Sequence, residues 1–523
     1  MSVASPPSLP RPIQSRILKI SLFATGLAGI VAEYVLSTLA TYFLGDSVFQ
    51  WTMIVSIMLF SMGLGSRLSQ LFEKNLLQTF IFIEFALSVF SAFSALVTYV
   101  ASGYTLYTGL IIYTLSIVIG ILIGLEIPLV VRVNDEFQSL RINVASVMEK
   151  DYFGSLLGGI FFAFVGLPYL GLTYTPFLLG FINFSVAMTL VALLWGQMSS
   201  TQRRKVGGAA AGVSLLLVAG LVGAEPVILY GEQVRYKDKV IYDEQSRYQK
   251  IVLTQWKDDY WLFINGNQQL STVDEVMYHE PLVHPAMQLA VRPQSVLVLG
   301  GGDGCAVREV LKYSSVQAVT VVDLDPAMTE LGKSHPVLVS LNEGSLTDER
   351  VHIVNQDAFT FAEQTADYYD VIIIDLPDPK SADLSRLYTR EFYQLLARHL
   401  RPHGVLITQA GSPYFATRAF QCIDRTLQQA GFRTQPLHNQ IVTMGEWGWI
   451  LGIKEENPIP LKETLQRMSF EAIDTQWLNQ EAMLLMTSFG KNYFQDASDS
   501  VEVNTLGDQV LYRYYLKGNW DLY

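Results

Sequence analysis

The segment SVLVLGGGDGCAVREVLKY, Ser295 to Tyr313, decides the fold of the second half of this chain. An apolar run ends in a glycine-rich turn, and Val307, Val310 and Leu311 then share one face of a helical pattern. The segment predicts a strand, a turn and a helix, with glycines that let the backbone approach a ligand closely. Because such turns are common, the meaning of this one depends on the strands that follow.

Three further apolar runs follow, and each ends at an aspartate. AVTVVDLDP places Asp323 about twenty residues beyond the turn, where an acid commonly binds ribose hydroxyls. RVHIVNQDAF ends near Asp357 and YDVIIIDLPDP reaches Asp375, while Asp303 lies in the glycine turn itself. One such acid is often only a turn former or a helix cap. Four at corresponding positions predict a Rossmann-like fold of the class I methyltransferase type, with a nucleoside site at the carboxyl ends of its strands.

The sequence just before this fold is predicted to form a small antiparallel sheet. Apolar and polar residues alternate in three segments that start at Val227, and glycine and asparagine turns separate them. The segments are VILYGEQVRYKDKVIYDE, YQKIVLTQW and YWLFINGNQQL. A cap-like serine and early acids then predict a helix from Asp274 to about Ala290. The predicted domains are a transmembrane domain 1–225, a β-rich part 226–290, a Rossmann-like domain 291–455 and a C-terminal extension 456–523.

The first 225 residues consist of apolar blocks, each about long enough to cross ~30 Å of hydrocarbon as a helix. Over the whole chain 50% of residues are hydrophobic and 16% are charged, as in a protein that is part membrane and part soluble. We therefore predict an all-α transmembrane bundle of about seven helices. The blocks are 18–43, 48–66, 78–100, 105–131, 153–171, 174–196 and 206–224.

Loop charges give this bundle an orientation. Basic residues occur before the first block and after the second, fourth and sixth blocks. The other loops contain no Lys or Arg, and the loop after the first block contains a single acid, Asp46. The positive-inside rule predicts a multi-pass protein of the cell membrane with a cytoplasmic N-terminus. Seven crossings would leave the second half outside the cytoplasm. Two alternatives stay open: the last block is re-entrant, or the fifth and sixth are miscounted around Pro168.

Three acids, Glu33, Glu84 and Glu126, lie within or near the apolar blocks. A carboxylate in lipid is costly, so such residues usually face a partner, a cavity or a ligand path. Either they are neutral or hydrogen-bonded between helices, with Glu126 near the interface, or they form a cation site.

The overall charge narrows the range of ligands. The formal net charge of −12 argues against nucleic acid and suits cationic ligands. The two cysteines, Cys305 and Cys422, cannot build a disulfide framework.

Several motifs together resemble the spermidine synthases, the polyamine aminopropyltransferases. QSRYQ (Gln245–Gln249), NGNQQLSTVDEVMYHE (Asn265–Glu280), GGGDG, VDLD, QDA, DLPDP and a later LY appear in the family's order and spacing over roughly residues 227–455. Class I methyltransferases share the fold and the glycine turn but lack the YHE segment and the paired acids. The apolar half lies outside the resemblance to soluble members and is similar to membrane-fused versions.

The resemblance implies that decarboxylated S-adenosylmethionine is a co-substrate that gives an aminopropyl group to putrescine and leaves methylthioadenosine. It implies no cofactor and no metal, and a homo-oligomer of unspecified size. Asp323 would bind the ribose, Asp357 the adenine amino group and Asp303 the aminopropyl amine. The residues implied to hold the donor are Gln245, His279, Asp303, Asp323 and Asp357.

The acceptor side of the resemblance rests on the acids of DLPDP. Asp375 would be the general base, Asp378 would help bind the acceptor, and Gln269 would line the site. A protonated amine cannot attack carbon, so a carboxylate must take its proton, while the sulfonium leaves without an acid. KSADLSRLY, Lys380 to Tyr388, would be a loop that closes over both substrates.

The acceptor segment departs from the family pattern. Leu376 and Pro377 separate the two acids where serines are usual, and TMGEWGW has Met444 where a tyrosine would contact the acceptor. Putrescine is the predicted acceptor, with a longer polyamine or another amine as alternatives. Two other functions are a methyltransferase, and a polyamine transporter or sensor with an inactive synthase-like domain.

Overall fold

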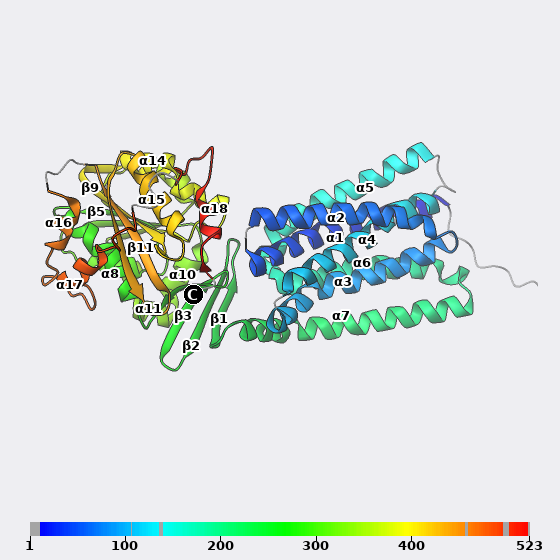
Figure 1. Ribbon diagram of the computed structural model, residues 1–523. Helices are drawn as coiled ribbons and strands as arrows, with labels where there is room; N and C mark the ends of the chain where they lie inside the picture. The colour runs from blue at the N-terminus through cyan, green and yellow to red at the C-terminus, as the bar shows by residue number, and fades with distance from the viewer. Residues whose placement is uncertain are drawn as a thin grey trace, which may run out of the picture. The chain divides into compact units, whose positions relative to one another are not determined.

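The computed structural model describes residues 11–45, 47–105, 107–134, 140–454, 459–494 and 501–520. These residues form two compact units, which divide between Val240 and Ile241 (Figure 1). The first unit is helical and the second is an α/β unit. Asp46, predicted as the lone acid of the first loop, lies outside the described residues.

Seven α-helices build the first unit, and they correspond to the seven predicted blocks. They are α1 (Arg11–Leu44), α2 (Ser47–Leu68), α3 (Leu76–Tyr104), α4 (Thr108–Asn134), α5 (Leu140–Phe161), α6 (Gly171–Leu194) and α7 (Ser200–Arg235), with short helices η1 (Ser69–Leu71), η2 (Phe162–Leu170) and η3 (Trp195–Gln197).

Six uninterrupted helical stretches are long and apolar enough to cross a membrane. The fifth, Arg141–Leu193, has 53 residues and contains both α5 and α6. At 1.5 Å per residue it would measure roughly 80 Å, more than twice the hydrocarbon thickness. The chain turns at Gly171, which has a φ of +61°. The fifth and sixth blocks are therefore separate helices, as predicted.

The seventh helix is longer than the predicted seventh block. Its buried positions recur every three or four residues, from Val206 through Ala224 and on to Ile228 and Glu232. This helical period continues past Pro226, so the prediction of strands from Val227 is wrong. The two units divide between Val240 and Ile241, five residues beyond the end of this helix, rather than near residue 225. The helix is continuous from Ser200 to Arg235 and is long and apolar enough to cross a membrane, and whether it crosses stays a prediction.

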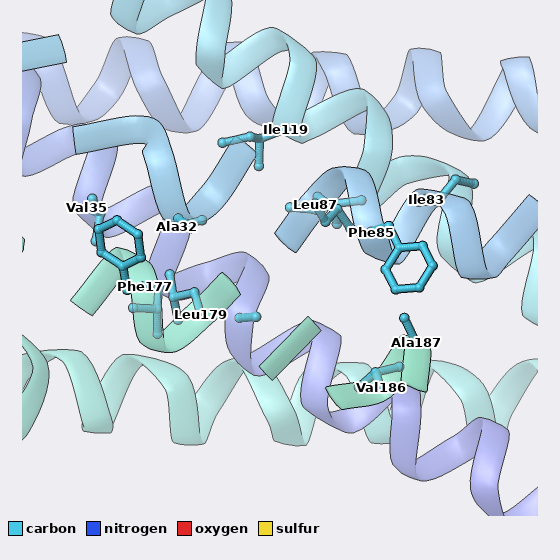
Figure 2. Packing of buried hydrophobic residues seen from close by; sticks show 14 of the residues in the cluster. Ala32, Val35, Ile83, Phe85, Leu87, Ile119, Phe177, Leu179, Val186 and Ala187 are labelled. Atoms are coloured by element: carbon cyan, nitrogen blue, oxygen red, sulfur yellow. The ribbon is translucent and has the colours of Figure 1, made fainter. Parts of the chain in front are cut away.

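The helices of the first unit pack closely through small residues. A Cβ at Gly124 of α4 would lie 2.1 Å from the carbonyl oxygen of Met62, and one at Gly154 of α5 would lie 2.1 Å from that of Phe23. Glycines thus allow backbone contact, as is usual between membrane helices. Figure 2 shows part of the apolar interior, where Phe177 and Leu179 of α6 lie near Val35 of α1.

The unit begins and ends at opposite ends of the bundle. Tyr42, near the C-terminal end of α1, donates a hydrogen bond of 2.8 Å to the carboxylate of Glu232, near the C-terminal end of α7. The C-terminal ends of α1 and α7 therefore lie together. The N-terminal end of α1 is at the other end of the bundle, more than thirty residues of helix away.

The three acids singled out in the sequence all lie inside this unit. Glu33 is 8% exposed, Glu84 0% and Glu126 2%. The carboxyl groups of Glu84 and Glu126 are neighbours, and Thr25 and Asp151 lie beside Glu126. Glu126 is therefore buried within the helical unit, and its position near the membrane interface stays a prediction.

The second unit contains the two predicted sheets. A four-stranded antiparallel sheet has the order β1-β2-β3-β4, with β1 (Lys239–Gln245), β2 (Lys250–Trp256), β3 (Asp259–Ile264) and β4 (Asn267–Ser271). Helix α8 (Val276–Leu289) follows, within two residues of its predicted start and one of its predicted end.

The larger sheet has seven strands in the order β10-β11-β9-β8-β5-β6-β7. Its strands are β5 (Ser295–Gly300), β6 (Ala318–Asp323), β7 (Val351–Asn355), β8 (Tyr369–Asp375), β9 (Leu400–Gly411), β10 (Arg433–Ile441) and β11 (Gly445–Ile453). Strands β5 to β9 are parallel, and β10 and β11 form an antiparallel hairpin at one edge.

Helices cover the larger sheet and bury it on both faces. They are α9 (Cys305–Leu311), α10 (Pro326–Ser334), α11 (Pro336–Leu341), α12 (Ala358–Gln364), α13 (Ala382–Ser385), α14 (Arg390–Arg398), α15 (Thr417–Gln429), α16 (Leu461–Gln466), α17 (Gln480–Met486) and α18 (Leu511–Leu516), with short turns η4 (Ser345–Thr347) and η5 (Arg386–Tyr388). Val296 and Val298 enter one core, while Leu297 and Leu299 enter the other. This double burial explains the unbroken apolar runs of the sequence.

The order of connection reverses between β5 and β8, which lie side by side in the middle of the sheet. Gly300 pairs with Asp375 at the carboxyl end of these strands. A Cβ at Gly300 would lie 2.0 Å from the carbonyl oxygen of Asp375, and the φ of Gly300 is +84°. Glycine is therefore required here for both space and backbone conformation.

We expect Gly300→Ala to destabilise the second unit by roughly 2–4 kcal/mol, because it adds a backbone clash to an unfavourable φ. The matched control is Gly431→Ala, since Gly431 has a φ of +98° but no atom within 4 Å of the added Cβ. Thermal unfolding of the full chain in detergent measures both. Equal losses in the two variants would contradict the steric account.

Candidate active site

The carboxyl edge of the larger sheet gathers the predicted acids. Asp323 and Asp375 are the last residues of β6 and β8, and Asp303 and Asp357 follow β5 and β7 by two or three residues. His279 of α8 joins them: its ligand atom and those of Asp303 and Asp375 all lie within 4.8 Å of one another. Ligands of such folds bind at this edge of the sheet.

His279 is held by a buried ion-pair network. Its Nδ1 lies 2.7 Å from the carboxylate of Glu275, one helical turn earlier, and its Nε2 lies 3.9 Å from Asp303. Arg308 of α9 donates to the same Glu275 carboxylate at 2.8 Å. Burial disfavours the charged ring, but the hydrogen bond that its Nδ1–H donates to Glu275 prevails and raises the pKa of His279 to about 9. The imidazole is therefore cationic at neutral pH.

Asp375 lies at the centre of this edge. Burial raises the pKa of its carboxyl to about 6, although the nearby His279 cation acts in the opposite direction. The hydroxyl of Tyr278 donates to its Oδ1 at 2.7 Å. The carboxyl is thus ionised at neutral pH and still basic enough to accept a proton.

The carboxylate of Asp323 accepts hydrogen bonds from two backbone N–H groups. Asp325 donates to its Oδ1 at 2.9 Å and Gly302 to its Oδ2 at 3.2 Å. A Cβ at Gly302 would lie 2.6 Å from that Oδ2, so the glycine turn also makes room for the carboxylate. Burial raises the pKa of Asp323 to about 6.

Asp357 is paired with a residue of the predicted closing loop. Its Oδ1 accepts from the backbone of Thr360 at 3.0 Å and so caps α12. Its Oδ2 accepts from Arg386 at 2.5 Å. The loop around α13 and η5 therefore lies over this part of the site.

Asp378, the second acid of DLPDP, meets two side chains. The hydroxyl of Tyr515, in the C-terminal extension, donates to its Oδ2 at 2.5 Å. The ammonium of Lys380 lies 3.7 Å from the same oxygen. The carboxylate is 15% exposed, and its Oδ1 is buried without a hydrogen-bond partner among the described residues.

The two predicted glutamines make local contacts. Gln245 donates to the carbonyl oxygen of Ser246 at 3.0 Å, and Gln269 donates to that of Asn267 at 3.2 Å. Within the described part of the chain, neither is hydrogen-bonded to a site aspartate. The structure thus brings together the histidine and the central acids, while the roles of the glutamines stay predictions.

The chain matches known proteins over almost its whole length. A family model for the spermine/spermidine synthase domain matches residues 275–463. The polyamine aminopropyltransferase of Oceanobacillus iheyensis is 39% identical over 98% of this chain and 98% of its own length. Polyamine aminopropyltransferase 2 of Aquifex aeolicus is 42% identical over 96% of this chain and 99% of its own.

The chain belongs to the spermine/spermidine synthase family. A solved spermidine synthase in complex with the transition-state analogue AdoDATO is 28% identical, covers 50% of this chain and 88% of its own, and has a TM-score of 0.46. The relatives support an enzyme that transfers an aminopropyl group, and they do not support the methyltransferase or the transporter and sensor alternatives. Their match extends over the helical unit as well as the α/β unit.

Sequence reasoning missed three residues of this synthase-type site. Tyr278 contacts Asp375, Glu275 orients His279, and Tyr515 contacts Asp378. The spacing of Glu275, Tyr278 and His279 on one helix face could have revealed the first two. Nothing local marks Tyr515, which is 137 residues from Asp378 in the chain.

The geometry of His279, Asp303 and Asp375 would also be compatible with a metal ion. Metal ligation requires a neutral imidazole. The pKa of His279, about 9, makes that form scarce at neutral pH. The chemistry of the three groups suits organic cations better, and the absence of a metal requirement stays a prediction.

We expect the stability of the protein to fall as the pH rises through about 9, because His279 then loses the proton that its pairing with Glu275 favours. The unfolded ring has a pKa near 6.5, so this contribution is complete below about pH 6.5. His279→Gln should reduce the difference between the unfolding temperatures at pH 6.5 and pH 9. His352→Gln, on an exposed position of β7, is the control. An identical pH dependence in both variants would contradict this assignment.

Proposed function

We propose that the protein transfers the aminopropyl group of decarboxylated S-adenosylmethionine to putrescine, giving spermidine and methylthioadenosine. The names of its relatives support this class of reaction. The observation that carries the proposal is the position of Asp375, a half-buried carboxylate with a pKa of about 6 at the crossover of the sheet. The donor is consumed as a co-substrate, so the reaction needs no cofactor.

The donor would bind along the carboxyl edge. Asp323 would accept hydrogen bonds from the ribose hydroxyls, and Asp357 would accept one from the adenine amino group. Asp303 would bind the ammonium of the aminopropyl chain, with His279 and Gln245 completing the donor site. Asp303 lies 3.9 Å from His279, and this contact supports a fixed orientation of its carboxylate.

The chemical step forms one C–N bond and breaks one C–S bond. The nitrogen lone pair of a deprotonated amine attacks the carbon next to the sulfonium, and the C–S electron pair returns to sulfur as neutral methylthioadenosine leaves. Asp375 takes the proton that the amine loses. Tyr278 fixes the orientation of that carboxylate, because its hydroxyl holds Oδ1 at 2.7 Å.

The acceptor would be held by the second acid. Asp378 would bind an ammonium of putrescine, and Gln269 would line the same space. Two carboxylates close together attract a dication and orient it for attack. The loop from Lys380 to Tyr388 would close over both substrates.

We expect the full chain in detergent to release methylthioadenosine only when decarboxylated S-adenosylmethionine and a suitable amine are both present. Asp375→Asn should lower the rate roughly 10²–10⁴-fold, because the amine then lacks a base. Release is followed by mass spectrometry with putrescine, spermidine and other amines.

The control is Asp367→Asn, since Asp367 is exposed and precedes the same strand at its opposite end. Wild-type protein that releases nothing with any amine would overturn the proposed reaction. Equal rates for wild type and Asp375→Asn would overturn the role of Asp375 alone. The amine that supports the highest kcat/KM identifies the acceptor.

We also propose that the helical unit spans the cell membrane with a cytoplasmic N-terminus. Six uninterrupted stretches with the required length and hydropathy support this, the fifth of them containing two helices. Lys74, in the loop before α3, and Arg204, near the start of α7, lie at the end of the bundle where α1 begins, as the positive-inside rule requires. Because α7 ends where α1 ends, the residues after α7 would emerge on the non-cytoplasmic side.

We expect a membrane-impermeant maleimide to label Lys237→Cys in intact cells but to leave Lys74→Cys unlabelled until the cells are opened. Lys237 follows α7, Lys74 precedes α3, and both positions are exposed. The two native cysteines are buried and give a low background. The reverse labelling would overturn the orientation, and protection of both sites would show that α7 does not cross.

A further inference from the structure

The C-terminal segment 501–520 lies beyond residues 275–463, which match the family model, yet it is bound to the loop over the site. Asn504 is fully buried. Its side-chain amide donates to the carbonyl oxygens of Ser385 at 2.8 Å and Tyr388 at 3.1 Å. The backbone carbonyl oxygen of Asn504 accepts a hydrogen bond of 2.9 Å from the backbone N–H of Arg390. The segment therefore holds the C-terminal ends of both short helical turns in that loop, α13 and η5.

From this anchor, α18 presents Tyr515 to Asp378. The hydroxyl donates to Oδ2 at 2.5 Å, a short distance typical of a donor bonded to an ionised carboxylate. The ring is held by Trp520, with ring centroids 4.6 Å apart and the indole N–H bonded to the Tyr515 carbonyl oxygen at 2.9 Å. A Cβ at Gly411 would lie 3.4 Å from Cε2 of the same ring.

The remaining oxygen of Asp378 has no donor. Oδ1 is buried and lacks a hydrogen-bond partner among the described residues, which leaves a costly unsatisfied group. A hydroxyl on Oδ2 fixes the plane of the carboxylate, so the direction in which Oδ1 points is fixed as well. An ammonium of the acceptor is the kind of donor that this oxygen requires.

The position of Lys380 indicates the kind of group that Asp378 and Tyr515 can bind together. Its ammonium lies 3.7 Å from Oδ2 of Asp378 and 5.8 Å from the centre of the Tyr515 ring. A carboxylate and an aromatic face together suit an alkylammonium group. The same groups therefore suit the end of a diamine.

The position at which the family pattern has a tyrosine is occupied here by Met444, which is 7% exposed and belongs to the core beneath the sheet. We propose that Tyr515, from the C-terminal extension, is the positioning residue of the acceptor site and orients Asp378 toward the acceptor ammonium. This inference rests on the proposed function, in which Asp378 binds the amine.

The test is Tyr515→Phe in the full chain, which removes the hydroxyl and keeps the ring. We expect the KM for the acceptor to rise roughly tenfold or more, because a hydrogen bond to a charged group is lost. The KM for decarboxylated S-adenosylmethionine and the unfolding temperature should stay close to wild type. A merely structural role would instead lower the unfolding temperature and alter both KM values together.

The matched control is Tyr514→Phe, the same change one residue earlier, where the hydroxyl donates to Glu502 at 3.0 Å. A second arm adds Tyr515→Phe to Asp378→Asn, and we expect no further rise in the acceptor KM, because Tyr515 acts through Asp378. Additive effects, or an unchanged acceptor KM in active Tyr515→Phe protein, would overturn the inference. Wild-type protein without amine-dependent turnover would overturn the proposed function first, so the two failures are distinguishable.

Discussion

The structure of the second unit depends on the contact between two neighbouring parallel strands in the middle of the larger sheet. At this contact the order in which the chain adds strands to the sheet reverses. Gly300 and Asp375 pair across β5 and β8, and the missing Cβ of the glycine allows the backbone of the aspartate to touch it. That contact sets the height at which β8 ends relative to the glycine turn. The carboxylate of Asp375 consequently reaches the same edge as Asp303, and α8 supplies Tyr278 and His279 to both.

Several carboxylates lie together at the carboxyl edge of the larger sheet, and cationic side chains of the protein lie close to them. Burial raises the pKa of Asp375 and of Asp323 to about 6, which reflects how unfavourable these charges are without a ligand. His279, made cationic by Glu275, lies among the acids. Arg386 and Lys380 approach from the loop. A sulfonium and a diammonium ion would carry the same sign of charge to the same carboxylates, so the site is complementary to its substrates before they arrive.

The sequence predicted the features that depend on local pattern. Apolar runs bounded by acids identified strands β5 to β8, and the apolar blocks identified the seven helices. The continuation of α7 through Pro226 was missed, because polar and aromatic residues mask a helical period that only the buried face reveals. Tyr515 was missed for a different reason. Its contact with Asp378 joins residues 137 positions apart, and sequence periodicity carries no information about such a pairing.

The ion pair between Arg386 and Asp357 would couple the position of the loop to binding of the nucleoside. The guanidinium is bound to Oδ2 of the carboxylate that we propose binds the adenine amino group. A donor that requires this oxygen would compete with the guanidinium, and its observed dissociation constant would then be the intrinsic one divided by the fraction of molecules whose loop is open. Asn504 holds that loop from the C-terminal extension, so a change at Asn504 would shift the same linkage.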